Sequence, residues 1–380
     1  MTSLSILPGV KLQDLIDLLL KDGYEVLGPT RGSDAIVYTP ITHVDQLPKG
    51  LIETQSGGSY RLRRAPDDDR LSGALFAHVV GPHSWKRYLF PPREKLWSAV
   101  RQAKGFSLEE EKEPSCKTAL LGVRACELAA IRIQDSVFQG GEFRDRGYVA
   151  RRGNTLLVAV DCQRAGETCF CSSTQTGPGV DGDCDIALTE FADPQDHHFL
   201  ARGASDQGWR LLNRLQLEEG TDTDSERRSE MVREVADSMG RHLPENAREL
   251  LADNPEHPHW DDVAGRCLNC GSCTMVCPTC FCSTVEDVTT LDGSSTARWR
   301  QWDSCFTVDF SFIHGGSIRR AAPARYRHWI THKLSHWYEQ FGSSGCTGCG
   351  RCITWCPVGI DITREVRALG DTTNAETGGR

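Results

Sequence analysis

Two short stretches decide the fold of the C-terminal part of this chain: residues 267–278, CLNCGSCTMVCP, and residues 346–357, CTGCGRCITWCP. Each contains a triplet of cysteines separated by two residues, followed after three further residues by a fourth cysteine and a proline. This is the spacing of bacterial ferredoxins, in which the triplet binds one cubane and the fourth cysteine binds the other. The motifs therefore predict two 4Fe–4S clusters.

The crosswise use of the fourth cysteines assigns the ligands of each cluster. The first cluster is expected to bind Cys267, Cys270, Cys273 and Cys356, and the second Cys346, Cys349, Cys352 and Cys277. A pair of zinc ribbons or a disulfide cluster is the alternative. Zinc sites use pairs of cysteines separated by two residues rather than a triplet with a fourth Cys-Pro, so the spacing favours iron–sulfur clusters.

The segment between the motifs, residues 278–345, is longer than in a compact ferredoxin. It resembles the α-helical ferredoxin type of respiratory iron–sulfur subunits, and residues 325–341 form a helical pattern that leads to the second motif. We therefore predict a mainly α-helical two-cluster ferredoxin-like domain over residues 261–368. Residues 369–380 are small and polar and predict a disordered tail.

The N-terminal part contains two apolar runs, residues 119–123 and 155–160, with a helical segment between them. A strand–turn–helix–strand order is typical of a parallel βαβ unit, so residues 1–205 are predicted to form an α+β or α/β domain. Residues 206–260 are acidic, polar and rich in proline near their end. They predict a helical linker between the two domains.

A second set of thiols belongs to the N-terminal domain. Cys126 and Cys162 come just after the two predicted strands, and Cys169 and Cys171 follow shortly afterwards. Because the carboxyl ends of parallel strands meet at one edge of a sheet, these thiols are expected to converge. Four thiols are the ligand set of a third 4Fe–4S cluster; the alternative is a group of buried free thiols.

The remaining cysteines carry weaker predictions. Cys280, Cys282 and Cys305 are enough for another cluster with a non-cysteine ligand, but packing beside the ferredoxin core or redox tuning is favoured. Cys116 precedes its strand, and Cys184 follows a glycine-rich loop, so neither is assigned as a ligand.

Composition excludes several classes of function. The net charge of −9 argues against nucleic-acid binding, and the apolar stretches are too short to span a membrane. The 17 cysteines, an odd number in a chain whose N-terminus lacks a signal-peptide pattern, predict a cytoplasmic protein. Residues 177–182 match the dinucleotide-binding pattern GxGxxG only superficially, so no flavin or nucleotide site is expected on this chain. No catalytic residue is predicted either.

Several segments resemble a known family. Residues 122–131 (GVRACELAAI), 169–178 (CFCSSTQTGP), 185–190 (DIALTE), 277–282 (CPTCFC) and 302–305 (WDSC) are similar to blocks in the β, or iron–sulfur, subunits of soluble NAD(P)-linked nickel–iron hydrogenases, the sulfhydrogenases. The same family includes the corresponding iron–sulfur subunits of anaerobic sulfite reductases. The resemblance runs from about residue 90 to residue 362, and the chain departs from it at the acidic linker and at Cys184.

The resemblance implies a non-catalytic electron-transfer subunit of a hetero-oligomer. A flavin subunit would exchange electrons with NAD(P)H, and this chain would relay them to the small and large hydrogenase subunits. The corresponding electron-transfer subunit of an anaerobic sulfite reductase is the alternative within the family. An alternative of another class is a self-contained thiol or iron–sulfur reductase whose site is the N-terminal crevice.

Overall fold

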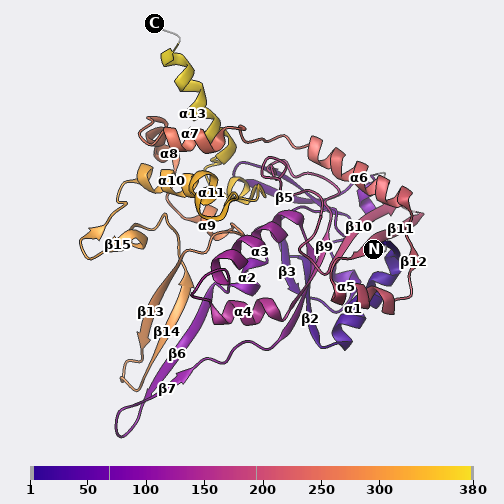
Figure 1. Ribbon diagram of the computed structural model, residues 1–380, viewed down its shortest axis with the longest axis horizontal. Coiled ribbons are helices and arrows are strands. Elements are labelled where there is room, and N and C mark those ends of the chain that lie inside the picture. Colours follow the sequence, from indigo (N-terminus) through magenta and orange to yellow (C-terminus); the bar gives the residue numbers. More distant parts are fainter. Residues whose placement is uncertain (1–3, 68, 194, 378–380) are drawn as a thin grey trace.

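The computed structural model describes residues 4–67, 69–193 and 195–377 of the chain. It is a mixed α/β structure with a large sheet in its N-terminal half and a group of helices around the cysteine motifs (Figure 1). No described helix has the length and apolar character needed to cross a membrane.

The large sheet has the strand order β12-β1-β11-β10-β9-β8-β2-β3. Its strands are β1 (Leu4–Pro8), β2 (Tyr24–Arg31), β3 (Ile36–Pro40), β8 (Lys117–Val123), β9 (Thr155–Val160), β10 (Ile186–Asp193), β11 (Asp196–Gly203) and β12 (Glu218–Glu219). The four central strands β2, β8, β9 and β10 are parallel to their neighbours in this group, and the outer pairs are antiparallel. The predicted parallel βαβ unit is therefore present.

Helices cover both faces of this sheet. One face packs against α1 (Leu12–Lys21) and α5 (Asp206–Arg214), whose leucines lie in the same apolar cluster as Val26 and Val158. The other face packs against α2 (Lys86–Leu89), α3 (Ala125–Phe138) and α4 (Arg146–Gly153). The strands are nearly continuous apolar runs because both of their faces are buried, as expected for parallel strands.

The C-terminal half consists mainly of short helices. They are α7 (Ala247–Asp253), α8 (His259–Arg266), α9 (Ser272–Met275), α10 (Ala322–Thr331), a π-helical turn (His332–His336), α11 (Trp337–Phe341), α12 (Arg351–Thr354) and α13 (Ile362–Thr377). Their core includes Trp260, Tyr326, Trp329 and Ile353 and is lined by the cysteines of both motifs.

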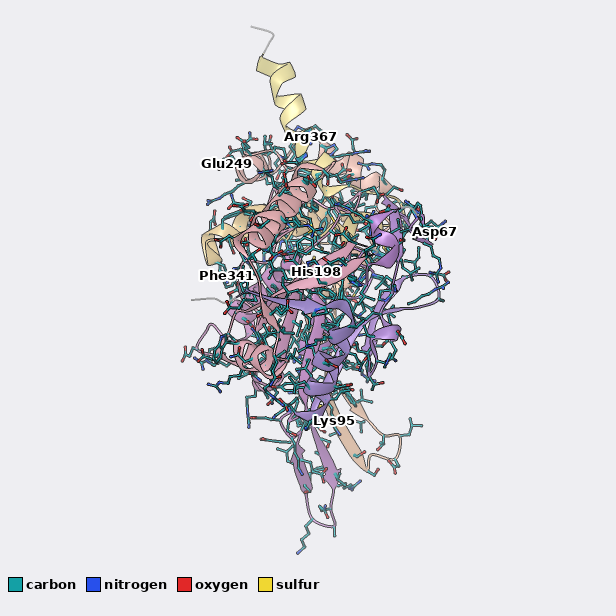
Figure 2. The ribbon with its side chains drawn as sticks, turned by 90° about the vertical axis from the view of Figure 1, so that its right-hand side faces the viewer. Asp67, Lys95, His198, Glu249, Phe341 and Arg367 are labelled. Atoms are coloured by element: carbon teal, nitrogen blue, oxygen red, sulfur yellow. The ribbon has the colours of Figure 1, made fainter. Side chains whose placement is uncertain are left out.

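A second, four-stranded antiparallel sheet joins distant parts of the chain. Its strand order is β13-β14-β6-β7, and its strands are β6 (Arg93–Arg101), β7 (Phe106–Glu110), β13 (Ser283–Thr289) and β14 (Ser295–Trp302). The sheet extends from the body as an arm (Figure 1), with Lys95 on it in the side view (Figure 2). The segment between the motifs thus contains strands as well as helices, so the mainly α-helical character predicted for residues 261–368 is not confirmed.

The remaining elements are small. Two hairpins pair β4 (Leu51–Ser56) with β5 (Ser59–Arg64) and β15 (Phe312–Ile313) with β16 (Gly316–Ser317). Single 3-10 turns occur at Gly9–Lys11, Val44–Gln46, Arg70–Gly73 and Val308–Ser311.

Two predicted segments differ from the structure. The expected linker, residues 206–260, begins inside the α/β layers, because Leu211 and Leu212 of α5 are buried in the core and β12 pairs with β1. α6 (Asp222–Asp237) also packs on the sheet, because its Met231 lies in one buried cluster with Phe191 and Leu200, and only the region after α6 leads to the C-terminal helices. The expected disordered tail, residues 369–380, is helical up to Thr377, where α13 ends, and residues 378–380 lie outside the described residues.

Candidate iron–sulfur sites

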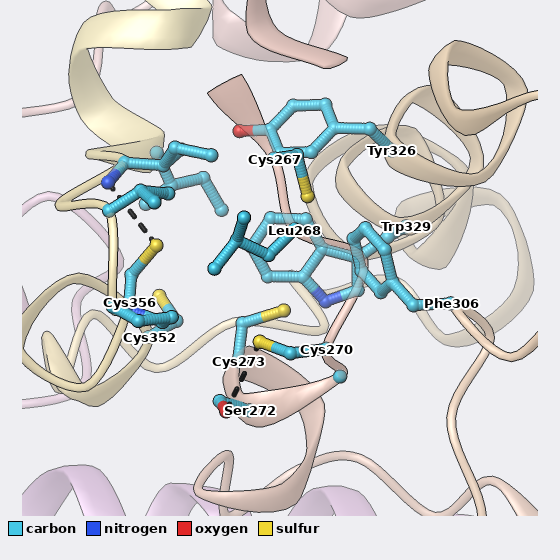
Figure 3. A pocket seen from close by; sticks show the side chains of 15 residues that line it. Cys267, Leu268, Cys270, Ser272, Cys273, Phe306, Tyr326, Trp329, Cys352 and Cys356 are labelled. Atoms are coloured by element: carbon cyan, nitrogen blue, oxygen red, sulfur yellow. Dashed lines mark hydrogen bonds between the residues drawn. The ribbon is translucent and has the colours of Figure 1, made fainter. Parts of the chain in front are cut away.

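The thiols predicted for the first cluster surround one pocket. Cys267, Cys270 and Cys273 come from the first motif, and Cys356 from the second. Apolar and aromatic residues complete the wall: Leu268, Phe306, Tyr326, Trp329, Val358, Ile360 and Ile362. Figure 3 shows the four sulfurs around a common space, together with that of Cys352. Cys356 of the second motif thus lies with the triplet of the first, which fits the crosswise ligand sets expected from the spacing.

The two motifs have the same local backbone. Asn269 and Gly271 in the first, and Gly348 and Gly350 in the second, all have positive φ, between 53° and 75°. Gly271 precedes α9 and Gly350 precedes α12, so each left-handed residue ends the loop and starts a helix. In both loops a backbone N–H donates to the first cysteine: Asn269 N lies 3.4 Å from Cys267 Sγ, and Gly348 N lies 3.4 Å from Cys346 Sγ.

The thiols predicted for the second cluster form a deeper group. Cys346, Cys349 and Cys352 interact electrostatically with one another and with Cys277. Cys349 is 8% exposed, whereas Cys270 at the first pocket is exposed. Cys349 is therefore shielded from solvent, whereas the first group reaches the surface at Cys270; the other cysteines of both groups are partly buried.

The thiols predicted for a third cluster also come together. Cys162 follows β9, and Cys126 lies in the first turn of α3, which follows β8. Cys162 interacts with both Cys169 and Cys171, and Cys126 interacts with Cys171. The carboxyl ends of parallel strands thus bring these side chains to one edge of the sheet, as the βαβ pattern predicts.

The third group touches the second. Cys126, Cys171 and Cys349 belong to one buried cluster. The backbone N–H of Phe170 donates to the Gly348 carbonyl over 2.8 Å, so the loop of the third group runs along the loop of the second motif.

Gly348 is required at this contact. A Cβ at this position would lie 2.6 Å from Cα and N of Cys171, and φ is +60°. We expect Gly348→Ala to lower the free energy of unfolding by about 2–5 kcal/mol, from left-handed strain together with the clash.

The matched control is Gly342→Ala, where φ is +69° and no atom lies within 4 Å of the added Cβ. This variant should lose only the strain contribution, about 1–2 kcal/mol. Denaturant titrations of the two iron-loaded chains measure the difference. Equal losses would contradict the close approach of the two loops.

Burial controls the protonation of the free thiols. It raises the pKa of Cys126 and Cys273 well above the usual value, and raises those of Cys169 and Cys346 to about 12. Without a cation these thiols would stay protonated at neutral pH. Iron removes the proton from a coordinating thiol, so the donor sets fit iron–sulfur clusters.

The described residues contain no group of three or more His, Cys, Asp or Glu side chains arranged around a single metal ion. Zinc in a structural site needs four ligands around one point. In a cubane each thiolate binds a different iron, so its ligands stand further apart.

The other cysteines lie apart from these groups or beside them. Cys116 is exposed, and Cys184 is buried in the apolar core with Val180 and Ala187. The thiols of Cys280, Cys282 and Cys305 lie between the first two groups: Cys280 interacts with Cys277 and Cys282, and Cys305 with Cys282 and Cys273.

Buried charges near the thiols were not predicted from the sequence. Arg351, which is fully buried, pairs with Glu127 over 2.7 Å and interacts with Cys349 and Cys126. Its Nη1 has no hydrogen-bond partner among the described residues, as expected for a donor that faces an anionic group not made of protein. Sequence offers one signal for this pair: Glu127 directly follows Cys126, and Arg351 directly precedes Cys352.

Comparisons with known proteins support an iron–sulfur protein. The family described as 4Fe-4S dicluster domain matches residues 266–360. Sulfhydrogenase 2 subunit beta of Pyrococcus furiosus is 28% identical over 338 residues, which cover 87% of this chain and 92% of that protein. No solved structure matches. The resemblance to hydrogenase β subunits is thus confirmed: the chain is a homologue of a sulfhydrogenase β subunit and contains a 4Fe–4S dicluster domain.

Proposed function

We propose that this chain is the iron–sulfur electron-transfer subunit of a cytoplasmic NAD(P)-linked nickel–iron hydrogenase, and that it binds three 4Fe–4S clusters. Cys267, Cys270, Cys273 and Cys356 would hold the first cluster, Cys346, Cys349, Cys352 and Cys277 the second, and Cys126, Cys162, Cys169 and Cys171 the third.

The observation that carries this proposal is the serial arrangement of the thiol groups. Cys126 and Cys171 of the third group contact Cys349 of the second. At the other end, Cys352 of the second group also lines the pocket of the first. The groups thus form one row from the edge of the sheet to a pocket near the surface.

The protein's part is to hold, space and shield the clusters. Clusters of this kind supply one-electron transfer, which lets a row of them divide the two-electron chemistry of a flavin into single steps. Around the first pocket, Trp329, Tyr326 and Phe306 exclude water from one side. Cys270 is exposed on the other side, so an electron would leave or enter the row there.

The proposed partners come from the homologue and not from this chain alone. The related protein is named a sulfhydrogenase subunit, which supports a hetero-oligomer. Small and large hydrogenase subunits and a subunit that binds flavin and NAD(P) are the partners that the family resemblance implies. The electron-transfer subunit of an anaerobic sulfite reductase is the second candidate, because the same sequence blocks occur there. A self-contained reductase is disfavoured, because Cys126, Cys169 and Cys171 at the sheet edge are buried and Cys126 and Cys171 pack against Cys349 of the second motif.

The native complex tests the assignment. Purified without oxygen from its own cells, it should contain nickel, flavin and a hydrogenase large subunit together with this chain. The complex should also reduce NAD(P)+ with hydrogen. Sirohaem with no nickel would instead assign the chain to a sulfite reductase, and turnover of NAD(P)H by the chain alone would contradict a pure relay.

A further inference from the structure

Three thiols that the proposed clusters do not use lie together beside the second motif. Cys280 and Cys282 follow Cys277 in the loop that leads into β13, and Cys305 follows β14. Because Ser283 pairs with Trp302 at the base of this hairpin, the two ends of the segment meet. The N–H of Asp303 donates to the Cys282 carbonyl over 2.9 Å, and the thiols of Cys282 and Cys305 interact with each other.

Two buried lysines face this group. Lys333 is 6% exposed and Lys86 is 3% exposed. Nζ of Lys333 lies 3.3 Å from Cys277 Sγ and 2.7 Å from Thr279 Oγ1. Nζ of Lys86 lies 3.1 Å from the Cys280 carbonyl oxygen and 3.8 Å from the centre of the Trp302 ring.

Neither lysine has a carboxylate partner among the ion pairs of the described residues; the groups near them that can carry a negative charge are cysteine thiols. Those acting on Lys86 are Cys280, Cys277 and Cys282. Those acting on Lys333 include Cys277 and Cys280. Burial of an ammonium group is unfavourable unless an anion compensates it, so two such groups at one place require negative charge there.

The helix that carries Lys333 is distorted at this position. A π-helical turn, His332–His336, interrupts the otherwise continuous helix between α10 and α11. Such turns occur frequently at functional sites. Within this turn Lys333 is buried whereas His336 is exposed, so the irregular turn presents the ammonium to the thiols.

Packing alone does not account for these features. Neutral thiols can fill apolar space without any need for cations, and a single lysine at Cys277 would be enough to tune the second cluster. Lys86, however, donates a hydrogen bond to the Cys280 carbonyl, and its ammonium group lies over the Trp302 ring, next to the unassigned thiols. Bound thiolates with their irons and sulfides are anionic and supply the missing charge.

We propose that Cys280, Cys282 and Cys305 bind an additional iron–sulfur cluster, with Lys333 and Lys86 as its buried counter-charges. Three thiolates suit a three-iron cluster or a cubane that takes one non-cysteine ligand. The site goes beyond the proposed function, because it uses none of the thiolates assigned to the other clusters, and its place beside Cys277 adds a neighbour to the second cluster.

The test uses the full chain, reconstituted without oxygen from ferrous iron and sulfide. Cys282→Ser and Cys305→Ser should each lose about three or four iron atoms and a matching amount of acid-labile sulfide. The electron paramagnetic resonance signals of the ferredoxin-type pair should remain. The control is Cys116→Ser, an exposed cysteine, which should keep all its iron. Unchanged iron in both variants would overturn the proposal.

A second measurement does not depend on how these variants fold. In Cys126→Ser, which removes the proposed third cluster, two ferredoxin-type clusters alone account for about eight iron atoms. Iron clearly above that number supports the additional site, and about eight or fewer overturns it. A different result would contradict the proposed function itself: a Cys346→Ser variant whose iron content and ferredoxin signals are unchanged.

The role of Lys86 as a counter-charge can be tested separately, through the midpoint potential of the additional cluster. Lys86→Met should lower the midpoint potential of the signal that Cys282→Ser removes, because a buried positive charge favours the reduced and more negative cluster. Lys86→Arg should restore most of the potential, since it keeps the charge. An unshifted potential in Lys86→Met would contradict a role for this lysine as counter-charge.

Discussion

Replacing Cys126 by serine is expected to remove about four iron atoms per chain and one of the paramagnetic signals of the reduced protein. The side chain lies in the first turn of α3, is 7% exposed, and interacts with Cys171 and Cys349. Serine has nearly the same shape but is a poor ligand for iron in a cubane, so the third cluster loses one of its four proposed ligands. Iron analysis and spin counting of the reconstituted chain measure both effects.

Cys184→Ser is the matched control for this variant. Cys184 is 8% exposed, so both substitutions bury a hydroxyl to the same extent. Its neighbours are apolar residues of the sheet core, among them Val180 and Ala187, rather than the thiols at the sheet edge. The control should therefore keep its iron. Equal iron in the two variants would show that Cys126 is a buried free thiol and that the row has no third cluster.

The location of the third group explains why its loss matters for electron transfer. The group contacts the second motif through Cys349 and through the backbone of Phe170 and Gly348. When three clusters are arranged in series, removal of a terminal cluster leaves the other two intact but interrupts electron transfer at that end. We therefore expect Cys126→Ser to retain the ferredoxin-type signals and to transfer electrons between partner subunits far more slowly than Cys184→Ser.

Local spacing in the sequence predicts the thiol groups because a cluster imposes short, fixed intervals. The two motifs bring their thiols together across residues 278–345, and the order of β8, α3 and β9 brings Cys126 towards Cys162. Both predictions rest on a pattern within a few residues, or on the general rule that parallel strands end at one edge.

Pairings between distant segments could not be predicted in this way. The strand β6 pairs with β14, about two hundred residues further along the chain, and no short-range signal specifies which exposed strands will pair. The same holds for α5 and β12, whose acidic surroundings suggest a linker although Leu211 and Leu212 are buried in the sheet core. Composition describes the exposed face of such elements and says little about the buried one.

The buried charges were missed for a related reason. A lysine or arginine in sequence is on average a surface residue, so nothing marks Lys333 or Arg351 as buried. Both become understandable only when the thiols around them are seen together.

Arg351→Met is expected to lower the free energy of unfolding by about 3–5 kcal/mol, because it leaves Glu127 as an uncompensated charge in the interior. The guanidinium of Arg351 is fully buried. Its Nη2 lies 2.7 Å from Glu127 Oε1, and its Nε lies 2.8 Å from the Gly81 carbonyl oxygen. The pair therefore joins α12 of the second motif to α3 and to the loop before α2.

Two further variants distinguish the effect of breaking the buried ion pair from the effect of removing any arginine side chain. Arg367→Met removes an exposed guanidinium whose hydrogen bond to the His242 carbonyl is 3.2 Å long, and should cost less than about 1 kcal/mol. The double variant Arg351→Met with Glu127→Gln removes both charges and should recover part of the stability lost in Arg351→Met alone. If the double variant is instead as unstable as the sum of the two single variants, the charges act independently. The contact between the second motif and the sheet edge would then be held by packing rather than by this ion pair.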